Sequence, residues 1–183
     1  MNAADVVAAA VAAAPDALFV SSLGTATSAL RLASEDGAHL YLGGAMGCGL
    51  AVALGVAARC PGRGVVAVLG DGELLMGAGS LWSLSGLRPA NLLVLVLDDG
   101  SYTITGGQDL VSPHALAGVA GALPHLAARS AASVEAVAAA VRTLLRPALV
   151  AARIDDPVWP GPSPFVEPHG VRAAFRANVD RRP

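Results

Sequence analysis

Lysine is absent from this sequence of 183 residues, and all twelve of its basic residues are arginines. The absence excludes a phosphate-binding loop of the Walker type, which needs its lysine, and an internal pyridoxal Schiff base. Charged residues make up only 14% of the chain, whereas typical globular domains have about 25%. So little charge suggests a surface that other subunits partly cover, although a GC-rich genome that favours alanine, glycine and arginine would give the same composition.

Cysteine is scarce, and long apolar runs are missing. Cys48 and Cys60 are isolated and fit neither metal-ligand spacing nor a disulfide framework, so we expect ordinary thiols. No apolar run approaches the length of a membrane-spanning helix. Asp5 and Asp16 interrupt an N-terminal stretch that also lacks the basic start of a signal peptide. The net charge of −2 gives no electrostatic basis for binding nucleic acid. We therefore expect a cytoplasmic protein that binds neither membranes nor nucleic acid.

Short apolar runs alternate with helical segments along the whole chain. The alternation predicts one α/β domain over residues 1–183, with a doubly wound, mostly parallel sheet and helices on both faces. We expect strands at residues 17–21, 39–42, 64–69, 91–97, 125–129 and 148–154. We expect helices at residues 2–14, 27–33 (ending near Gly37), 46–59, 74–87, 113–123, 133–145 and 169–176, with Asn2 and Ser133 as N-caps. The proline-rich segment 156–164 is expected to be irregular.

Two of the expected strands each lead into an acidic turn that contains glycine. Residues 64–69 run into Gly70-Asp71-Gly72-Glu73, and residues 91–97 run into Asp98-Asp99-Gly100-Ser101-Tyr102. The carboxyl ends of parallel strands form the ligand crevice of such a sheet, so both turns should meet at one edge. Carboxylates and loop carbonyls suit Mg²⁺, which completes its shell with phosphate and water. Glycine leaves backbone N–H groups open to a phosphate. The pattern predicts a site for a metal-bound phosphate.

The two turns and their spacing resemble the signature of thiamine-diphosphate enzymes, and the chain resembles the cofactor-binding half of 2-oxo acid decarboxylases in that group. It is most similar to phosphonopyruvate decarboxylases and to the beta subunit of sulfopyruvate decarboxylases. The resemblance covers most of the chain and implies the thiamine-diphosphate-binding fold of the PP type. Besides the two turns, it rests on four segments: Ser22-Leu23-Gly24-Thr25, Tyr41-Leu42-Gly43-Gly44-Ala45-Met46-Gly47, Thr105-Gly106-Gly107-Gln108 and Pro164-Phe165-Val166-Glu167-Pro168.

The resemblance implies a Mg²⁺ site formed by the side chains of Asp71 and Asp99 and the backbone carbonyl of Ser101. Asp99 departs from the family, which has asparagine there, and would add a negative charge beside the diphosphate. Asp98 remains an alternative ligand. For Asp71, an N-cap of the following helix is the plain structural alternative.

The resemblance also implies the contacts with thiamine diphosphate. Gly24, Thr25, Gly72 and Glu73 would hold the diphosphate, the last two through backbone N–H groups. Gly44 and Met46 would meet the aminopyrimidine, with the Met46 side chain supporting the bent cofactor, and Tyr102 and Ile104 would line the pocket. An ordinary turn at Gly24 and Thr25 and a core methionine at position 46 are the plain alternatives.

Two further polar residues lie near the second turn in the sequence. Gln108 is a candidate substrate contact, and His114 is a candidate proton donor. A simple loop position for Gln108 and a helix start or solvated ring for His114 are the alternatives.

Family members activate the cofactor with a glutamate from a second domain of similar size, which this chain is too short to contain. None of its glutamates stands in a suitable context: Glu35, Glu73, Glu135 and Glu167. The resemblance therefore implies no catalytic residue here and a separate pyrimidine-binding subunit of similar size that supplies the glutamate.

The expected function is the cofactor-binding subunit of a split decarboxylase, active only with its partner, that converts a 2-oxo acid to an aldehyde and carbon dioxide. Sulfopyruvate and phosphonopyruvate are the leading substrates. Three alternatives stay open: a carboligase subunit, a non-catalytic scaffold subunit that holds the cofactor, and a nucleotide-binding α/β domain. A Rossmann domain is the least favoured, because its glycine fingerprint is missing after the first strand.

Overall fold

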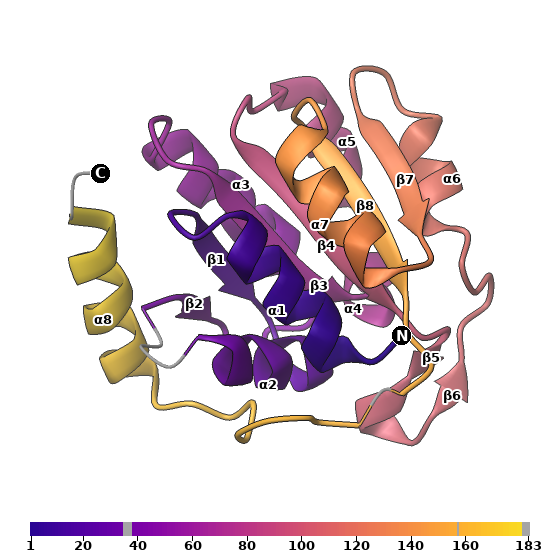
Figure 1. Ribbon diagram of the computed structural model, residues 1–183, viewed down its shortest axis with the longest axis horizontal. Helices are drawn as coiled ribbons and strands as arrows, with labels where there is room; N and C mark the ends of the chain where they lie inside the picture. Colours follow the sequence, from indigo (N-terminus) through magenta and orange to yellow (C-terminus); the bar gives the residue numbers. More distant parts are fainter. Residues whose placement is uncertain (35–37, 157, 181–183) are drawn as a thin grey trace.

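A six-stranded parallel sheet forms the centre of the protein, and the computed structural model describes residues 1–34, 38–156 and 158–180 (Figure 1). The strand order is β2-β1-β3-β4-β8-β7, and all neighbours run parallel. The strands are β1 (Leu18–Ser21), β2 (Leu40–Tyr41), β3 (Val65–Gly70), β4 (Leu92–Asp98), β7 (Ala127–Ala131) and β8 (Ala148–Arg153). This is the doubly wound sheet that the sequence predicts.

Helices cover both faces of the sheet, and each face has its own apolar core. One face packs against α1 (Ala3–Ala13), α2 (Gly24–Ala33) and α7 (Val134–Thr143). The other packs against α3 (Gly49–Arg59), α4 (Asp71–Met76), α5 (Gly79–Leu87) and α6 (Leu116–Gly121). The last helix, α8 (Pro168–Asp180), lies beside the β2 edge and has no buried residue (Figure 1).

The middle strands are apolar throughout because both of their faces are covered. Along β4, Leu93, Leu95 and Leu97 belong to the core under α1, α2 and α7, whereas Leu92 and Val94 belong to the opposite core. Side chains of a strand alternate between its two faces, so a strand buried on both sides needs an unbroken apolar run. The continuous runs that mark β3 and β4 in the sequence follow from this burial.

The order of the strands reverses beside β1. β2 pairs with one edge of β1, and β3 pairs with the other. In open parallel sheets the connections on either side of such a reversal separate, which leaves a crevice beyond the carboxyl ends of the strands. The fold thus predicts a ligand site where the turns after β1 and β3 begin.

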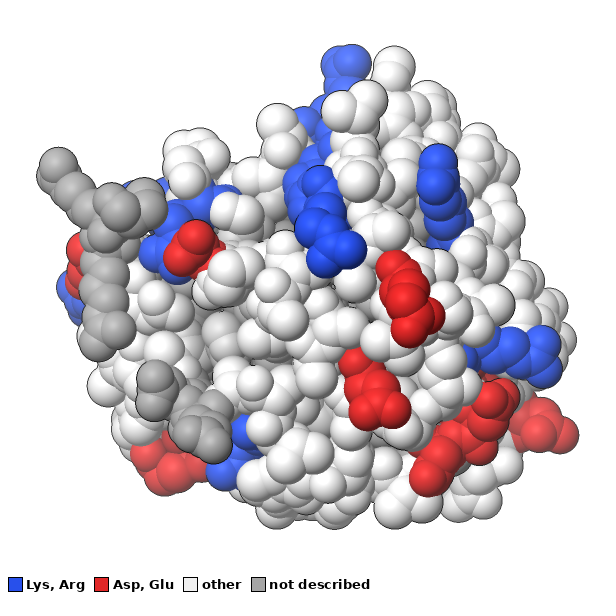
Figure 2. Space-filling model, viewed as in Figure 1, with Lys and Arg blue, Asp and Glu red and all other residues white. Residues whose placement is uncertain are grey.

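The predicted N-caps are confirmed: the side chain of Asn2 accepts a hydrogen bond from the Asp5 N–H, and that of Ser133 accepts one from the Ala136 N–H. The described part of segment 156–164 contains no helix or strand, as predicted. Among the residues that the structure describes, no helix combines the length and apolar character needed to cross a membrane. The face in Figure 2 is mostly uncharged, with its charged side chains scattered.

Several predicted boundaries are wrong. The single helix expected at 74–87 is two helices, α4 and α5, which separate at Gly77 and Ala78. A side chain at Gly77 would collide with the carbonyl oxygen of Gly47, so the close approach of another segment requires glycine at this position. The helix expected at 46–59 begins only at Gly49, and the helix expected from residue 27 already begins at Gly24.

The C-terminal half differs from its prediction in three places. The helix expected at 113–123 is reduced to α6, after His114 in a left-handed conformation with φ 62°. The strand expected at 125–129 is shifted to Ala127–Ala131, and the last helix is longer than expected. A hairpin of β5 (Ser101–Tyr102) and β6 (Gln108–Asp109), joined through the short helix η1 (Thr103–Thr105), was not predicted at all. The expected helix end near Gly37 lies outside the described residues.

Candidate functional site

A cleft lies at the carboxyl ends of β1, β3 and β4, with about 640 Å³ of space that no atom fills, including the solvent at its mouth. The turn after β1, the acidic turn after β3, and the loop after β4 form its walls. The predicted metal and cofactor contacts line it except Gly44: Gly24, Thr25, Met46, Asp71, Gly72, Glu73, Asp99, Ser101, Tyr102 and Ile104. Residues from distant parts of the sequence thus meet where the strand order reverses.

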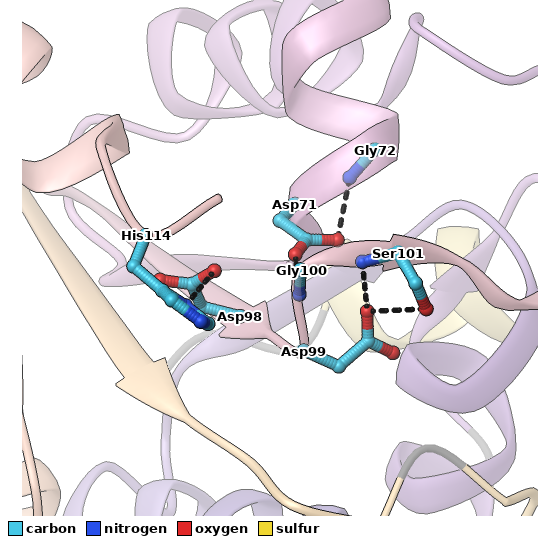
Figure 3. A network of polar contacts seen from close by, with 7 residues as sticks. All are labelled: Asp71, Gly72, Asp98, Asp99, Gly100, Ser101 and His114. Atoms are coloured by element: carbon cyan, nitrogen blue, oxygen red, sulfur yellow. Dashed lines mark hydrogen bonds and ion pairs between the residues drawn. The ribbon is translucent and has the colours of Figure 1, made fainter. Parts of the chain in front are cut away.

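Asp71 is the first residue of α4, and its side chain is almost completely buried at 2% exposure. Its Oδ1 accepts a hydrogen bond of 2.7 Å from the Gly72 N–H, and its Oδ2 accepts one of 2.6 Å from the Gly100 N–H (Figure 3). The carboxylate therefore joins the two acidic turns. The N-cap of α4 is Gly70, so simple N-capping does not describe the role of Asp71.

The electrostatic environment of Asp71 favours a bound cation. The pKa of its carboxyl group is raised to about 7, mainly by burial and further by the negative charges of Asp99 and Asp98, against the bonds from Gly100 and Gly72, which lower it. A cation next to the carboxylate would relieve the repulsion among the three acidic groups and stabilise the ionised form.

Asp99 is half-buried, and its carboxylate is held by its own loop. Oδ1 accepts hydrogen bonds from the N–H (2.8 Å) and the hydroxyl (3.1 Å) of Ser101, and Oδ2 accepts one from the Thr103 hydroxyl (2.8 Å). The carboxylate turns toward Ser101 rather than toward Asp71 (Figure 3). Oδ2 accepts only one hydrogen bond, so its second lone pair leaves capacity for a metal ion. Thr103 was missed in the sequence, where nothing distinguishes it from an ordinary loop threonine.

The neighbouring acidic residue, Asp98, points to the other side of the strand. Its Oδ1 lies 3.0 Å from Nδ1 of His114, away from Asp99 (Figure 3). Asp98 and His114 are both outside the cleft lining. The geometry thus favours Asp99 over Asp98 as a metal ligand and gives His114 a structural partner instead of access to the cleft.

Two glycines let the loop after β4 lie directly on the other turns of the cleft. Gly24 has a left-handed backbone (φ 60°), and a side chain there would collide with Ile104. A Cβ atom on Gly72 would lie 2.7 Å from the ring of Tyr102. The residue before α2, Leu23, makes no side-chain cap.

Three of the four glutamates lie among the described residues. Glu73 lines the cleft, but its carboxylate accepts hydrogen bonds from the N–H groups of Gly47 and Gly49. Glu135 is exposed in the first turn of α7, and Glu167 accepts bonds from the first N–H groups of α8. Glu35 lies outside the described residues. Glu73 is thus the one glutamate in the described lining of the cleft, and its carboxylate is already engaged.

Two of the predicted contacts lie away from the cleft. Gly44 is exposed and does not line it. Gln108 is also exposed, and its side chain folds back on Thr105, with which it exchanges two hydrogen bonds. The loop alternative therefore describes Gln108 in this structure, and Gly44 as a cofactor contact stays a prediction.

Residues 21–158 match the family described as thiamine pyrophosphate enzyme, C-terminal TPP binding domain. The chain belongs to this family. The match starts at the end of β1 and includes the turns after β1, β3 and β4 that form the cleft. The predicted resemblance is confirmed, and the family's description supports thiamine diphosphate as the cofactor.

Two relatives with assigned functions are similar to this chain over part of their length. The phosphonopyruvate decarboxylase of Streptomyces viridochromogenes is 38% identical over 173 residues, which are 92% of this chain and 43% of that protein. The sulfopyruvate decarboxylase subunit beta of Methanocaldococcus jannaschii is 31% identical over 91 residues, which are 50% of this chain and 48% of that protein. The matched segments therefore cover less than half the length of either relative.

Solved structures share the fold. The 2-oxoglutarate:ferredoxin oxidoreductase from Magnetococcus marinus superposes with a TM-score of 0.69 at 15% identity, over 92% of this chain and 66% of that one. The thiamine diphosphate-dependent 4-hydroxybenzoylformate decarboxylase of Rhodococcus jostii RHA1 gives a TM-score of 0.65 at 23% identity, over 86% and 33%. At identities this low, the superpositions support the fold alone. They confirm the predicted fold class.

Proposed function

We propose that this chain is the cofactor-binding part of a thiamine-diphosphate-dependent decarboxylase that releases carbon dioxide and an aldehyde from a 2-oxo acid. The membership of the family and the names of the decarboxylase relatives support this reading. The observation that carries it is the cleft, where the turns after β1, β3 and β4 surround the buried carboxylate of Asp71.

In this proposal Mg²⁺ binds to Asp71, Asp99 and the backbone carbonyl of Ser101. Among residues 1–34, 38–156 and 158–180, no group of three or more His, Cys, Asp or Glu side chains is placed to hold a metal ion. Two carboxylates and a carbonyl would leave the rest of the shell to phosphate and water oxygens, which suits Mg²⁺ better than a metal that needs a full set of protein ligands. The negative charges of Asp99 and Asp98 beside Asp71 favour a cation at this position.

The remaining residues of the cleft fit the parts of thiamine diphosphate. Gly24, Thr25, Gly72 and Glu73, which all line the cleft, would hold the diphosphate. Met46 would support the aminopyrimidine side, together with the backbone of Gly44, and Tyr102 and Ile104 would shield the cofactor from water. When bound, thiamine diphosphate supplies an electron sink for the bond that breaks as carbon dioxide leaves.

The substrate is proposed to be a 2-oxo acid with a second anionic group, as in phosphonopyruvate or sulfopyruvate. The lining of the cleft contains no arginine among the described residues. A dianionic substrate therefore needs cationic groups from beyond this lining. This requirement agrees with a site that a second subunit completes.

We propose a separate pyrimidine-binding subunit of similar size as that partner, in a hetero-oligomer. The names of the sulfopyruvate decarboxylase relatives specify a beta subunit. The carboxylate of Glu73 is engaged by Gly47 and Gly49, so an activating glutamate would come from the partner. The cytoplasmic location expected from the sequence stays a prediction, which fractionation of cells would test.

Calorimetry of the purified chain with thiamine diphosphate and Mg²⁺, alone and with a candidate partner, tests the proposal. We expect saturable binding that a chelator abolishes and that Asp71→Asn weakens at least about tenfold, since charged ligands contribute most to such sites. With the partner present, sulfopyruvate or phosphonopyruvate should give carbon dioxide and the matching aldehyde. No binding of the cofactor by the complex at saturating Mg²⁺ would overturn the proposal.

The same material separates the alternatives. Products that contain an added aldehyde acceptor would indicate a carboligase. Tight cofactor binding without turnover of any 2-oxo acid would indicate a subunit that only holds the cofactor. Binding of a nucleotide in place of thiamine diphosphate would indicate a nucleotide-binding α/β domain.

A further inference from the structure

The carboxylate of Glu73 joins two walls of the cleft. Its Oε2 accepts a hydrogen bond of 2.6 Å from the Gly47 N–H, and its Oε1 accepts one of 2.8 Å from the Gly49 N–H. Glu73 is only 7% exposed. Short hydrogen bonds to a buried carboxylate are among the stronger polar contacts in proteins. The contact therefore ties α4, which carries Asp71, to the loop in front of α3.

This contact also replaces a missing cap. The residue before α3 is Cys48, and its side chain makes no capping hydrogen bond. The first N–H groups of a helix need acceptors, and a negative charge is favourable at that end. Glu73 supplies both from a different helix, so the start of α3 depends on the side chain of a residue in the acidic turn.

The joined segments are packed without space between them. A Cβ atom on Gly49 would lie 2.5 Å from the Leu69 side chain, and one on Gly47 would lie 3.2 Å from Cγ of Met76. Gly77 comes so close to the Gly47 carbonyl that a side chain at position 77 would collide with it. Residues 47–49 therefore have a fixed place on α4, and Glu73 supplies the polar part of that contact.

Met46 is the residue in front of this contact, and it lines the cleft together with Glu73. We infer that the side chain of Glu73 is a positioning residue, which holds residues 46–49 against α4 and so fixes Met46 in the cleft. The inference rests on the proposed function, in which Met46 supports the aminopyrimidine side of thiamine diphosphate. The same helix turn thereby organises both ends of the cofactor: Asp71 the diphosphate and Glu73, through Met46, the aminopyrimidine.

A comparison of two ligands tests this role. Thiamine diphosphate reaches Met46, whereas inorganic pyrophosphate with Mg²⁺ occupies only the diphosphate end. In the complex with its partner, Glu73→Ala should weaken thiamine diphosphate binding by about tenfold or more. It should change pyrophosphate binding by less than about threefold. Glu73→Gln keeps one of the two acceptors, so its effect should be intermediate, and it serves as the measured variant if Glu73→Ala does not fold.

Met46→Ala is the matched control, because it removes the side chain on which Glu73 is inferred to act. We expect Met46→Ala to weaken thiamine diphosphate and to leave pyrophosphate nearly unchanged. In the double variant, loss of the Glu73 carboxylate should add little further, because both changes remove the same contact.

Three results would contradict the inference, and each would indicate a different role for Glu73. Equal weakening of both ligands would assign Glu73 to the diphosphate end. No weakening of either would make the contact a helix cap only, and full additivity with Met46→Ala would show that Glu73 does not act through Met46. If the unmodified complex binds neither ligand, the proposed function itself fails, and that result differs from all of these.

Discussion

Nδ1 of His114 lies 3.0 Å from Oδ1 of Asp98, at the end of β4 and next to the loop that carries Asp99. The side chain of Asp98 is 5% exposed and that of His114 is 34% exposed, so the pair is shielded on one side only. Pro113 and the His114 ring also pack against Gly100, whose N–H donates to Asp71. A residue beyond the β5–β6 hairpin thus braces the loop of the candidate metal site.

Replacing His114 by alanine should destabilise the fold. The change leaves the buried Asp98 carboxylate without its partner, which costs about 1–3 kcal/mol in the free energy of unfolding. His114→Asn should recover part of the loss, because the asparagine amide nitrogen can take the position of Nδ1 and asparagine tolerates a left-handed backbone. Urea unfolding monitored by circular dichroism measures these differences.

The control for this prediction is His125→Ala. His125 has nearly the same left-handed backbone, with φ 60°, as His114 with φ 62°. It has no hydrogen bond among the described residues. His125→Ala therefore measures the cost of alanine in this conformation alone, and an equal loss at both positions would contradict a role for the Asp98–His114 pair.

Asp99→Asn should keep or improve the binding of thiamine diphosphate at saturating Mg²⁺. The amide oxygen can still accept the bonds from Ser101, and its NH₂ group can donate to the Thr103 hydroxyl. The change also removes a negative charge that raises the pKa of Asp71. Calorimetric titration compares the dissociation constants. A loss of affinity above about tenfold would argue against Asp99 as the second metal ligand.

Gly72→Ala should weaken cofactor binding, because the added Cβ atom would lie 2.7 Å from the Tyr102 ring and would force the loop after β4 away from the acidic turn. We expect a drop in affinity of about tenfold or more for thiamine diphosphate, measured as above. Gly55→Ala is the control: it lies within α3, and its Cβ atom would meet nothing within 4 Å. That variant should bind normally and gain about 0.5–1 kcal/mol of stability.

Acidification should destabilise the protein through His39. Burial lowers the pKa of His39 to about 4 in the folded protein, whereas an unfolded histidine titrates near 6.5. Between these pH values His39 binds a proton in the unfolded chain but not in the folded protein. The free energy of unfolding therefore falls as the pH drops from about 6.5 to about 4. The shift corresponds to about 3 kcal/mol at the acidic end. NMR titration of the imidazole measures the pKa directly.

His39→Phe isolates this contribution from that of the other titrating groups. The ring of His39 packs edge-on against Phe19 with centroids 5.0 Å apart, and its Nδ1 is buried without a hydrogen-bond partner among the described residues. Phenylalanine keeps the ring contact and removes the unpaired nitrogen. The variant should lose less stability than the unmodified protein between pH 7 and pH 4.5, and parallel curves would refute the assignment.

The strands around the site were predictable because burial imposes a pattern on sequence. A parallel strand covered on both faces must be apolar throughout, so β3 and β4 are visible as runs, and the acidic turns after them stand out by contrast. The two-residue strands β5 and β6 and the short helix η1 carry no such pattern, because segments of two or three residues show no periodicity. Thr103 and the fold-back of Gln108 were missed for the same reason.

The sequence by itself determined the family, the α/β class and the two acidic turns, because these depend on local composition and on order along the chain. Only the tertiary structure decided that Asp99 faces the cleft while Asp98 faces His114, that Ile104 lies over Gly24, and that Glu73 holds Gly47 and Gly49. Each of these is a contact between segments from different elements. Such contacts depend on strand register and on the close packing of whole elements, which no local pattern encodes.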